Sequence, residues 1–137
     1  MYFIYKMSIG ELPFYIGMTM RPESRYREHY FDSLSACYNI NRFMLDDRGE
    51  IANMKIIAAI KGRIKARELE RHFINLYSKH YYLINTEPWP HHLRSIGQRT
   101  EITNTKRLWP YYKEIEKQVK TWEQKMERLS QLTCPNG

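Results

Sequence analysis

The chain has 137 residues, enough for one hydrophobic core and too few for two domains of the usual size. Its 22 Lys and Arg against 15 Asp and Glu give a formal net charge of +7, which suits a polyanionic partner whose phosphates release counterions on binding. Two distant cysteines, Cys37 and Cys134, exclude a disulfide framework and a multi-cysteine zinc site, and no apolar run approaches the roughly 18 residues of a membrane span. We therefore expect a protein of the reducing cytoplasm without a membrane segment.

The N-terminal segment predicts an antiparallel hairpin. Residues 2–7 and 14–18 are rich in aromatic and β-branched side chains, which are typical of strands. Between them, residues 8–13 include Gly10 and Pro13, which favour a turn. We expect the two strands to pair with each other across this turn.

A helix is predicted from Pro22 to about Cys37. Proline suits the first helical position, and the acidic Glu23 favours the positive end of the helix dipole. The expected core stripe consists of Tyr26, Tyr30, Ser33 or Leu34, and Cys37. Arg25 and His29 lie four residues apart on a neighbouring strip and should therefore point the same way.

The middle of the chain predicts a short helix, a buried strand and a longer helix. We expect these elements over residues 39–47, 54–60 and 63–80. In the longer helix, Leu69, Phe73 and Leu76 make the apolar stripe. Glu70 lies at the margin of this stripe, whereas Glu68 points to solvent.

Two prolines then break regular structure, and a heptad pattern follows. Residues 86–105 are expected to form a loop or linker, and residues 106–132 a helix. The heptad positions are Leu108, Tyr112, Ile115, Val119, Trp122, Met126 and Leu129. The pattern leaves two alternatives open, a homodimer through this helix or packing along the domain of the same chain.

Six residues occur in an order and spacing that resemble the GIY-YIG nuclease family. Phe3-Ile4-Tyr5 and Tyr15-Ile16-Gly17 correspond to the two short family motifs, and Arg25, His29, Glu70 and Asn85 follow in the family's order. The resemblance implies an α+β fold, a small three-stranded antiparallel sheet flanked by helices in the order β-β-α-α-β-α. It places a catalytic domain at residues 1–85, before the linker and the C-terminal helix.

Two positions depart from the family pattern. Phe3 stands where the family usually has glycine, which changes a strand edge and removes no catalytic group. After Gly17, many members carry a lysine, whereas this chain has Met18-Thr19-Met20. Arg21 or Arg27 could supply the missing charge.

The resemblance implies a metal-dependent DNA endonuclease that cuts by direct hydrolysis. Tyr5 or His29 would accept the proton of the attacking water, Tyr15 would support that group, and Arg25 would hold the charge that develops on the phosphate. Glu70 would bind one Mg²⁺ or Mn²⁺ ion, and Asn85 would support the site. We expect contacts with nucleic acid from Arg21, Arg27, Arg63 and Lys65.

Simpler explanations exist for each residue. Strand tyrosines usually only pack, and Arg25 and His29 could pair with Asp32 on a solvated helix face. Two rival functions are a nucleic-acid-binding module that keeps this fold without cleavage, and an assembly protein that acts through its heptad helix. We expect structure-specific or weakly sequence-selective cutting, in a phage, a mobile element, or a defence or repair setting.

Overall fold

A tight hairpin opens the fold. In the computed structural model, which describes residues 1–31, 44, 50–85 and 108–133, strand β1 spans Tyr2–Ile9 and strand β2 spans Leu12–Thr19. Only Gly10 and Glu11 separate them, and Gly10 has a φ of 58°, which a side chain would disfavour. The predicted hairpin is present, with strands longer and a turn shorter than the sequence indicated.

The difference at the turn has a local cause. Pro13 lies inside β2 and pairs with Ser8, next to a register shift between Met7 and Ser8. A proline is tolerated there because β2 is an edge strand and the ladder is already irregular. The proline therefore does not end the strand.

The sheet is completed by strand β3, Asn53–Ile60, which pairs antiparallel with β1. The order β2-β1-β3 places β1 in the centre. This is the predicted three-stranded antiparallel sheet, and with its flanking helices it confirms the α+β class.

Three described helices flank the sheet. Helix α1 spans Pro22–Phe31, α3 spans Arg63–Ser78 and α5 spans Trp109–Thr133. The predicted start of α1 at Pro22 is confirmed, and α3 ends two residues before the expected His80. The predicted continuation of α1 to Cys37, the short helix over 39–47 and the linker over 86–105 lie outside the described residues.

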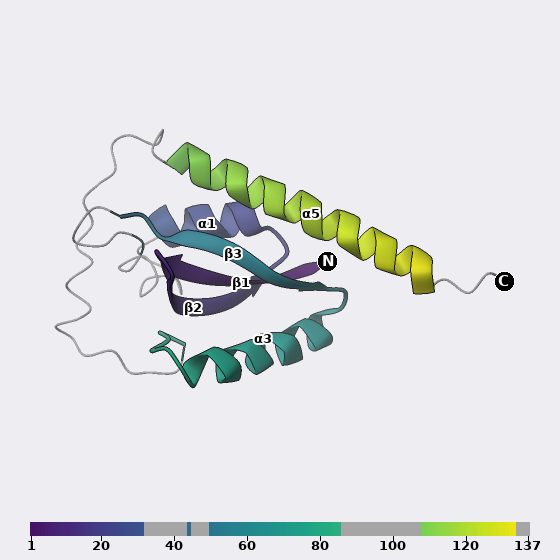
Figure 1. The fold of residues 1–137 in the computed structure, drawn as a ribbon, viewed down its shortest axis with the longest axis horizontal. Coiled ribbons are helices and arrows are strands. Elements are labelled where there is room, and N and C mark those ends of the chain that lie inside the picture. The colour runs from purple at the N-terminus through teal and green to yellow at the C-terminus, as the bar shows by residue number, and fades with distance from the viewer. Residues whose placement is uncertain (32–43, 45–49, 86–107, 134–137) are drawn as a thin grey trace.

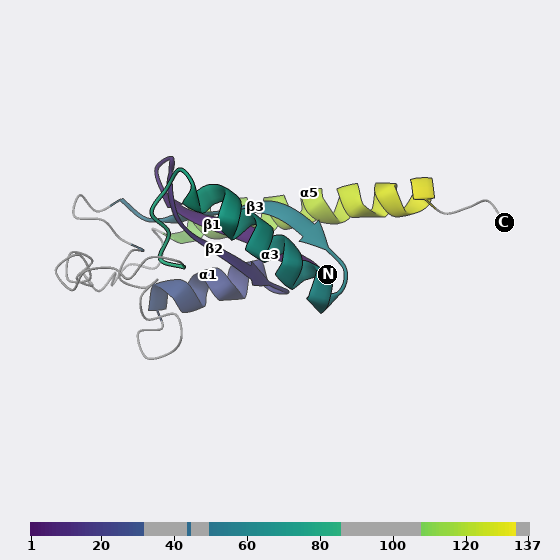
Figure 2. The ribbon, with the colours of Figure 1, turned by 90° about the horizontal axis from the view of Figure 1, so that it is seen from below.

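The helices make two layers, one on each side of the sheet (Figure 1). Helix α3 covers one face, where Ile4, Ile16 and Leu83 are buried. Helices α1 and α5 cover the other face; seen from below, α3 lies in front of the sheet and α5 behind it (Figure 2). On this second face, Tyr5 and Tyr26 belong to the larger core cluster.

Helix α5 packs on its own chain. Leu108, just before the helix, and Tyr112 and Ile115 within it are buried in the core on the α1 side of the sheet. These first heptad positions therefore pack against the domain of the same chain, which is one of the two predicted alternatives. The last turns run past the end of the sheet, where Leu129 is 46% exposed (Figure 1). A homodimer through residues 106–132 stays a prediction that concerns these last turns.

Within the described ranges, no helix is both long enough and apolar enough for a membrane span.

Candidate active site

Tyr5 is the buried centre of the site. It lies on the central strand β1 and faces the α1 layer, with 1% of its surface exposed. Gly17 is its partner on β2, and a Cβ at Gly17 would collide with the hydroxyl of Tyr5 and come within 2.8 Å of the Tyr15 ring. The glycine of the second motif is therefore needed because the Tyr5 side chain crosses directly over it.

His29 meets Tyr5 from helix α1. The Tyr5 hydroxyl lies 2.6 Å from His29 Nε2, and this hydrogen bond is buried. The Tyr15 ring is the third member, with its centroid 6.1 Å from that of Tyr5 and 5.6 Å from that of His29. The structure therefore brings together three of the six predicted residues, from two strands and one helix.

The environment of His29 keeps its imidazole neutral. Burial, and then the nearby positive charge of Arg25, lower the pKa of His29 to about 3. A neutral imidazole that carries its proton on Nδ1 can accept a hydrogen bond from the Tyr5 hydroxyl through Nε2. His29 itself is only 1% exposed, so neither of the two expected general bases reaches the protein surface. Tyr15 is only partly buried and is the ring of the three that solvent reaches.

Arg25 stands at the boundary between this buried cluster and the surface. Its side chain is 38% exposed, and Nη1 donates a hydrogen bond to Glu28 Oε2 at 3.0 Å. Its charge acts on His29, which agrees with the prediction that the two side chains share one side of α1. On its outer side, Arg25 lines a cavity of about 600 Å³.

Asn85 fixes the outer edge of strand β2. Its Oδ1 accepts a hydrogen bond from the N–H of Ile16 at 3.0 Å, and its Nδ2 donates one to the carbonyl of Ile16 at 2.7 Å. The N–H of Ile84 also donates to the carbonyl of Phe14 at 2.8 Å. The carboxamide of Asn85 thus makes the two hydrogen bonds that a neighbouring strand would make with Ile16. It holds the backbone of β2 between Tyr15 and Gly17.

Glu70 is the predicted residue that the structure places apart from the aromatic cluster. It lies on α3, which packs against the face of Ile4 and Ile16, whereas Tyr5 and Tyr15 face the α1 layer. Burial raises the pKa of the Glu70 carboxyl, and the Arg67 guanidinium opposes that effect. The part of the chain that the structure describes has no group of three or more His, Cys, Asp and Glu side chains suited to a metal ion. One half-buried carboxylate fits a hard cation that keeps most of its ligands as water and substrate oxygens.

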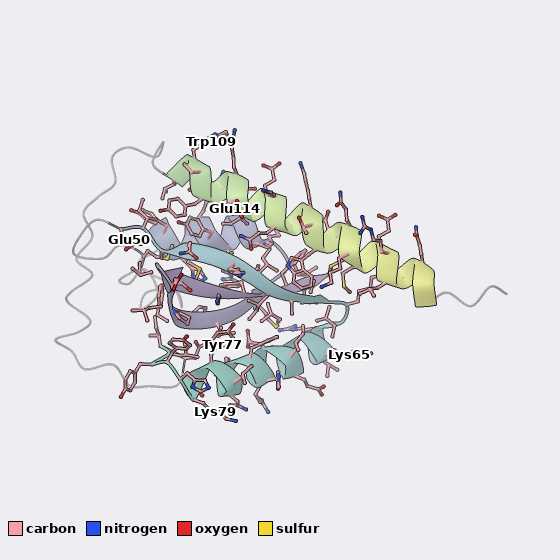
Figure 3. The ribbon with its side chains drawn as sticks, viewed as in Figure 1. Glu50, Lys65, Tyr77, Lys79, Trp109 and Glu114 are labelled. Carbon is pink, nitrogen blue, oxygen red and sulfur yellow. The ribbon has the colours of Figure 1, made fainter. Side chains whose placement is uncertain are left out.

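The four residues predicted to bind nucleic acid have different surroundings. Arg21 and Arg63 line the same cavity as Arg25. Arg27 packs over the Tyr112 ring at 4.6 Å and pairs with Glu23 at 3.4 Å, so it contributes to the contact between α1 and α5. Lys65 is exposed on the first turn of α3 and points away from the sheet (Figure 3).

Two residues that hold the opposite edge of the sheet, at β3, were not predicted. Gln118 of α5 accepts a hydrogen bond from the N–H of Ile56 at 2.7 Å and donates one to the carbonyl of Met54 at 3.1 Å. Trp122 Nε1 donates to the carbonyl of Ile56 at 3.2 Å. The sequence gives Trp122 only as a heptad position, and Gln118 has no pattern that could have indicated this contact.

Comparison with known proteins agrees with this geometry. The family model for the GIY-YIG catalytic domain matches residues 1–83, more than half of the chain. A search of curated proteins and a search of solved structures each found no significant match. The matched range includes both tyrosine motifs, α1 and α3, and ends just before Asn85 and the segment that leads to α5. The chain therefore belongs to the GIY-YIG family of nuclease-type catalytic domains.

Proposed function

We propose that the protein is a metal-dependent endonuclease that hydrolyses DNA phosphodiesters by direct attack of water. The observation that carries this proposal is the buried Tyr5–His29 hydrogen bond beside Arg25. It combines a proton acceptor and a fixed cation, the two groups that phosphodiester hydrolysis needs from side chains. The net charge of +7 supports a polyanionic substrate.

The aromatic cluster takes the proton of the attacking water. A tyrosine alone is a poor general base near neutral pH, because its ordinary pKa near 10 keeps the hydroxyl protonated. Here the neutral His29 can accept a hydrogen bond from the Tyr5 hydroxyl, which orients that hydroxyl and polarises its O–H bond. Since Tyr15 is the accessible ring, we assign the first contact with the substrate water to Tyr15, with Tyr5 and His29 behind it.

Arg25 holds the charge that accumulates on the phosphate. Its guanidinium can donate to two oxygens at once, and its ion pair with Glu28 keeps it oriented before substrate binds. Both side chains are substantially exposed, so this ion pair contributes little to stability and can be exchanged for a phosphate.

Glu70 would hold the divalent cation, Mg²⁺ or Mn²⁺. When bound, the cation would neutralise negative charge on the phosphodiester and its leaving oxygen. Glu70 and Arg25 lie on opposite layers, so a shared phosphate must sit at the edge of the sheet where the layers meet. The cavity supports this arrangement, because it is lined by Arg25 from the α1 layer and by Arg63 from the first turn of α3.

Two substitutions test the assignment. We expect Arg25→Ala to reduce Mg²⁺-dependent nicking of supercoiled plasmid by roughly 10²- to 10³-fold, the effect of removing a preorganised charge stabiliser. Glu70→Ala should also suppress nicking, whereas DNA binding by both variants, measured by fluorescence anisotropy, should largely survive. Glu68→Ala and Arg71→Ala are matched controls, because both residues are exposed on α3. Parental nicking by both test variants would show that the site is assigned wrongly.

A second candidate function is a nucleic-acid-binding module of the same fold that does not cleave. The observation that favours it is the separation of Glu70 from the aromatic cluster by the sheet. Binding of DNA by the parent protein without cleavage in either Mg²⁺ or Mn²⁺ would support this candidate against the endonuclease.

A further inference from the structure

The cavity beside Arg25 extends well beyond that residue. It is bounded by the start of β1, the end of β2, the first turn of α1 and the first residue of α3. Its volume of about 600 Å³ exceeds what one phosphate group fills and lies in the range of sites that hold a whole ligand. The cavity therefore has room for backbone on either side of a phosphate held by Arg25.

The charge of this cavity is strongly positive. Its described lining contains three guanidiniums, those of Arg21, Arg25 and Arg63, against the single carboxylate of Glu28. Glu28 already pairs with Arg25. Within the described part of the chain, Arg21 and Arg63 make no ion pair, so their charges are available to an anion.

The two cations approach from different layers. Arg21 directly precedes α1, and its backbone is fixed because its N–H donates to Thr19 Oγ1 at 3.0 Å and its carbonyl accepts from the N–H of Arg25 at 3.0 Å. Arg63 is the first residue of α3, on the other side of the sheet. Two cations that line one cavity from different layers suit a chain of phosphates better than an isolated anion.

We infer that Arg63 and Arg21 bind the backbone phosphates that flank the one held by Arg25. This inference rests on the proposed function, because it takes the phosphate at Arg25 to be the one that is cleaved. The substrate segment then passes around the end of the sheet where β1 begins and β2 ends, from the α1 layer to the α3 layer. Arg63 acts as a positioning residue in this arrangement and does not touch the reacting atoms.

The first test measures DNA binding without divalent metal, so that no cleavage is needed. Arg63→Ala should weaken binding about two- to fivefold, the scale of an exposed charge pair, and should lower the slope of log Kd against log salt by about one. Arg63→Lys should restore the slope, because the charge returns. Arg71→Ala is the matched control, since it removes the same charge from an exposed position of the same helix α3 outside the cavity lining. An Arg63→Ala variant that is indistinguishable from Arg71→Ala would overturn the inference.

The second test pairs the side chain with its phosphate. Neutral methylphosphonates are placed one at a time along the duplex. In the parent protein, neutralising the contacted phosphate should weaken binding, and in Arg63→Ala the same change should have no further effect. If the losses of affinity from Arg63→Ala and from the methylphosphonate are additive at every phosphate tested, the inference is overturned.

Kinetics separate this inference from the proposed function. In the cleavage assay, Arg63→Ala should raise KM and leave kcat within about twofold of the parent, whereas Arg25→Ala should lower kcat. A loss of kcat in Arg63→Ala at unchanged KM would overturn the positioning role. If the parent protein does not cleave and the two binding tests succeed, the nuclease proposal fails and the phosphate contact of Arg63 stands.

Discussion

Burial of His29 makes the stability of the fold depend on pH. The pKa of His29 is about 3 in the folded protein and ordinarily 6.5, so the unfolded chain binds a proton first as the pH falls. This contribution to stability is therefore fully present above about pH 6.5, and it decreases towards pH 3 by about 1.4 kcal/mol per pH unit.

We expect the free energy of unfolding, measured by urea titration, to begin to fall near pH 6.5 and to approach that slope between about pH 5.5 and pH 4. The variant His29→Gln removes the titrating group and should show a clearly smaller dependence over the same interval. Equal slopes in the two proteins would contradict the burial of a neutral His29.

At the residue scale, the sequence predicted better which side chains lie together than what surrounds them. Tyr5 and His29 are 24 positions apart, and only the resemblance to a family indicated that they meet. The four-residue spacing of Arg25 and His29 was enough to place them on one side of a helix. Their burial was not predictable, because an exposed and a buried histidine give the same pattern in a single sequence.

At the scale of elements, α5 protects the outer edge of β3. An edge strand presents unpaired backbone groups, and Gln118 pairs with two of them, the N–H of Ile56 and the carbonyl of Met54. Asn85 does the same for β2 at Ile16 on the opposite edge. Each edge of the sheet is thus closed at one point by the carboxamide of a side chain.

We expect Gln118→Ala to destabilise the protein by about 1–2 kcal/mol, because two partly buried hydrogen bonds are lost. Gln124→Ala, an exposed glutamine of the same helix, should change stability by no more than about 0.5 kcal/mol. Thermal unfolding measures both effects, and amide hydrogen exchange at Ile56 should accelerate only in Gln118→Ala. Equal stability of the two variants would show that the edge contact is not needed.

The elements themselves were largely predictable from period and turn chemistry, and their arrangement was not. The alternation of strand residues and the positions of Leu69 and Phe73 agree with what is buried in the structure. Leu76, predicted on the same stripe, is 43% exposed, so that part of the prediction is wrong. Periodicity does not say which face of a sheet a helix covers, so the separation of Glu70 from Tyr5 could not be foreseen. Contacts such as that of Gln118 with Met54, 64 positions apart, leave no trace in local sequence.

At the scale of the whole molecule, the core extends beyond the range that the family model matches. That range ends at residue 83, whereas Leu108, Tyr112 and Ile115 are 0%, 8% and 1% exposed in the core around Tyr26. The described part of α5 is therefore a structural part of the catalytic domain, and we do not regard it as a separate appendage.

Two truncations test this conclusion. Removal of residues 108–137 should abolish cooperative unfolding, because it exposes the core around Tyr26 and the edge of β3. Removal of residues 125–137 should leave a cooperatively unfolding protein, since Trp122 and everything before it remain. Urea titration followed by near-ultraviolet circular dichroism distinguishes the two. A cooperative transition in the shorter protein would show that residues 1–107 fold without α5.

The position of α5 in the chain also determines when the fold can be completed during translation. Every proposed catalytic group, from Tyr5 to Asn85, leaves the ribosome before the segment that covers Tyr26 and seals β3. The nascent chain therefore carries these side chains on an incomplete scaffold. The core closes only after Trp122 has itself left the ribosome and α5 can pack on β3.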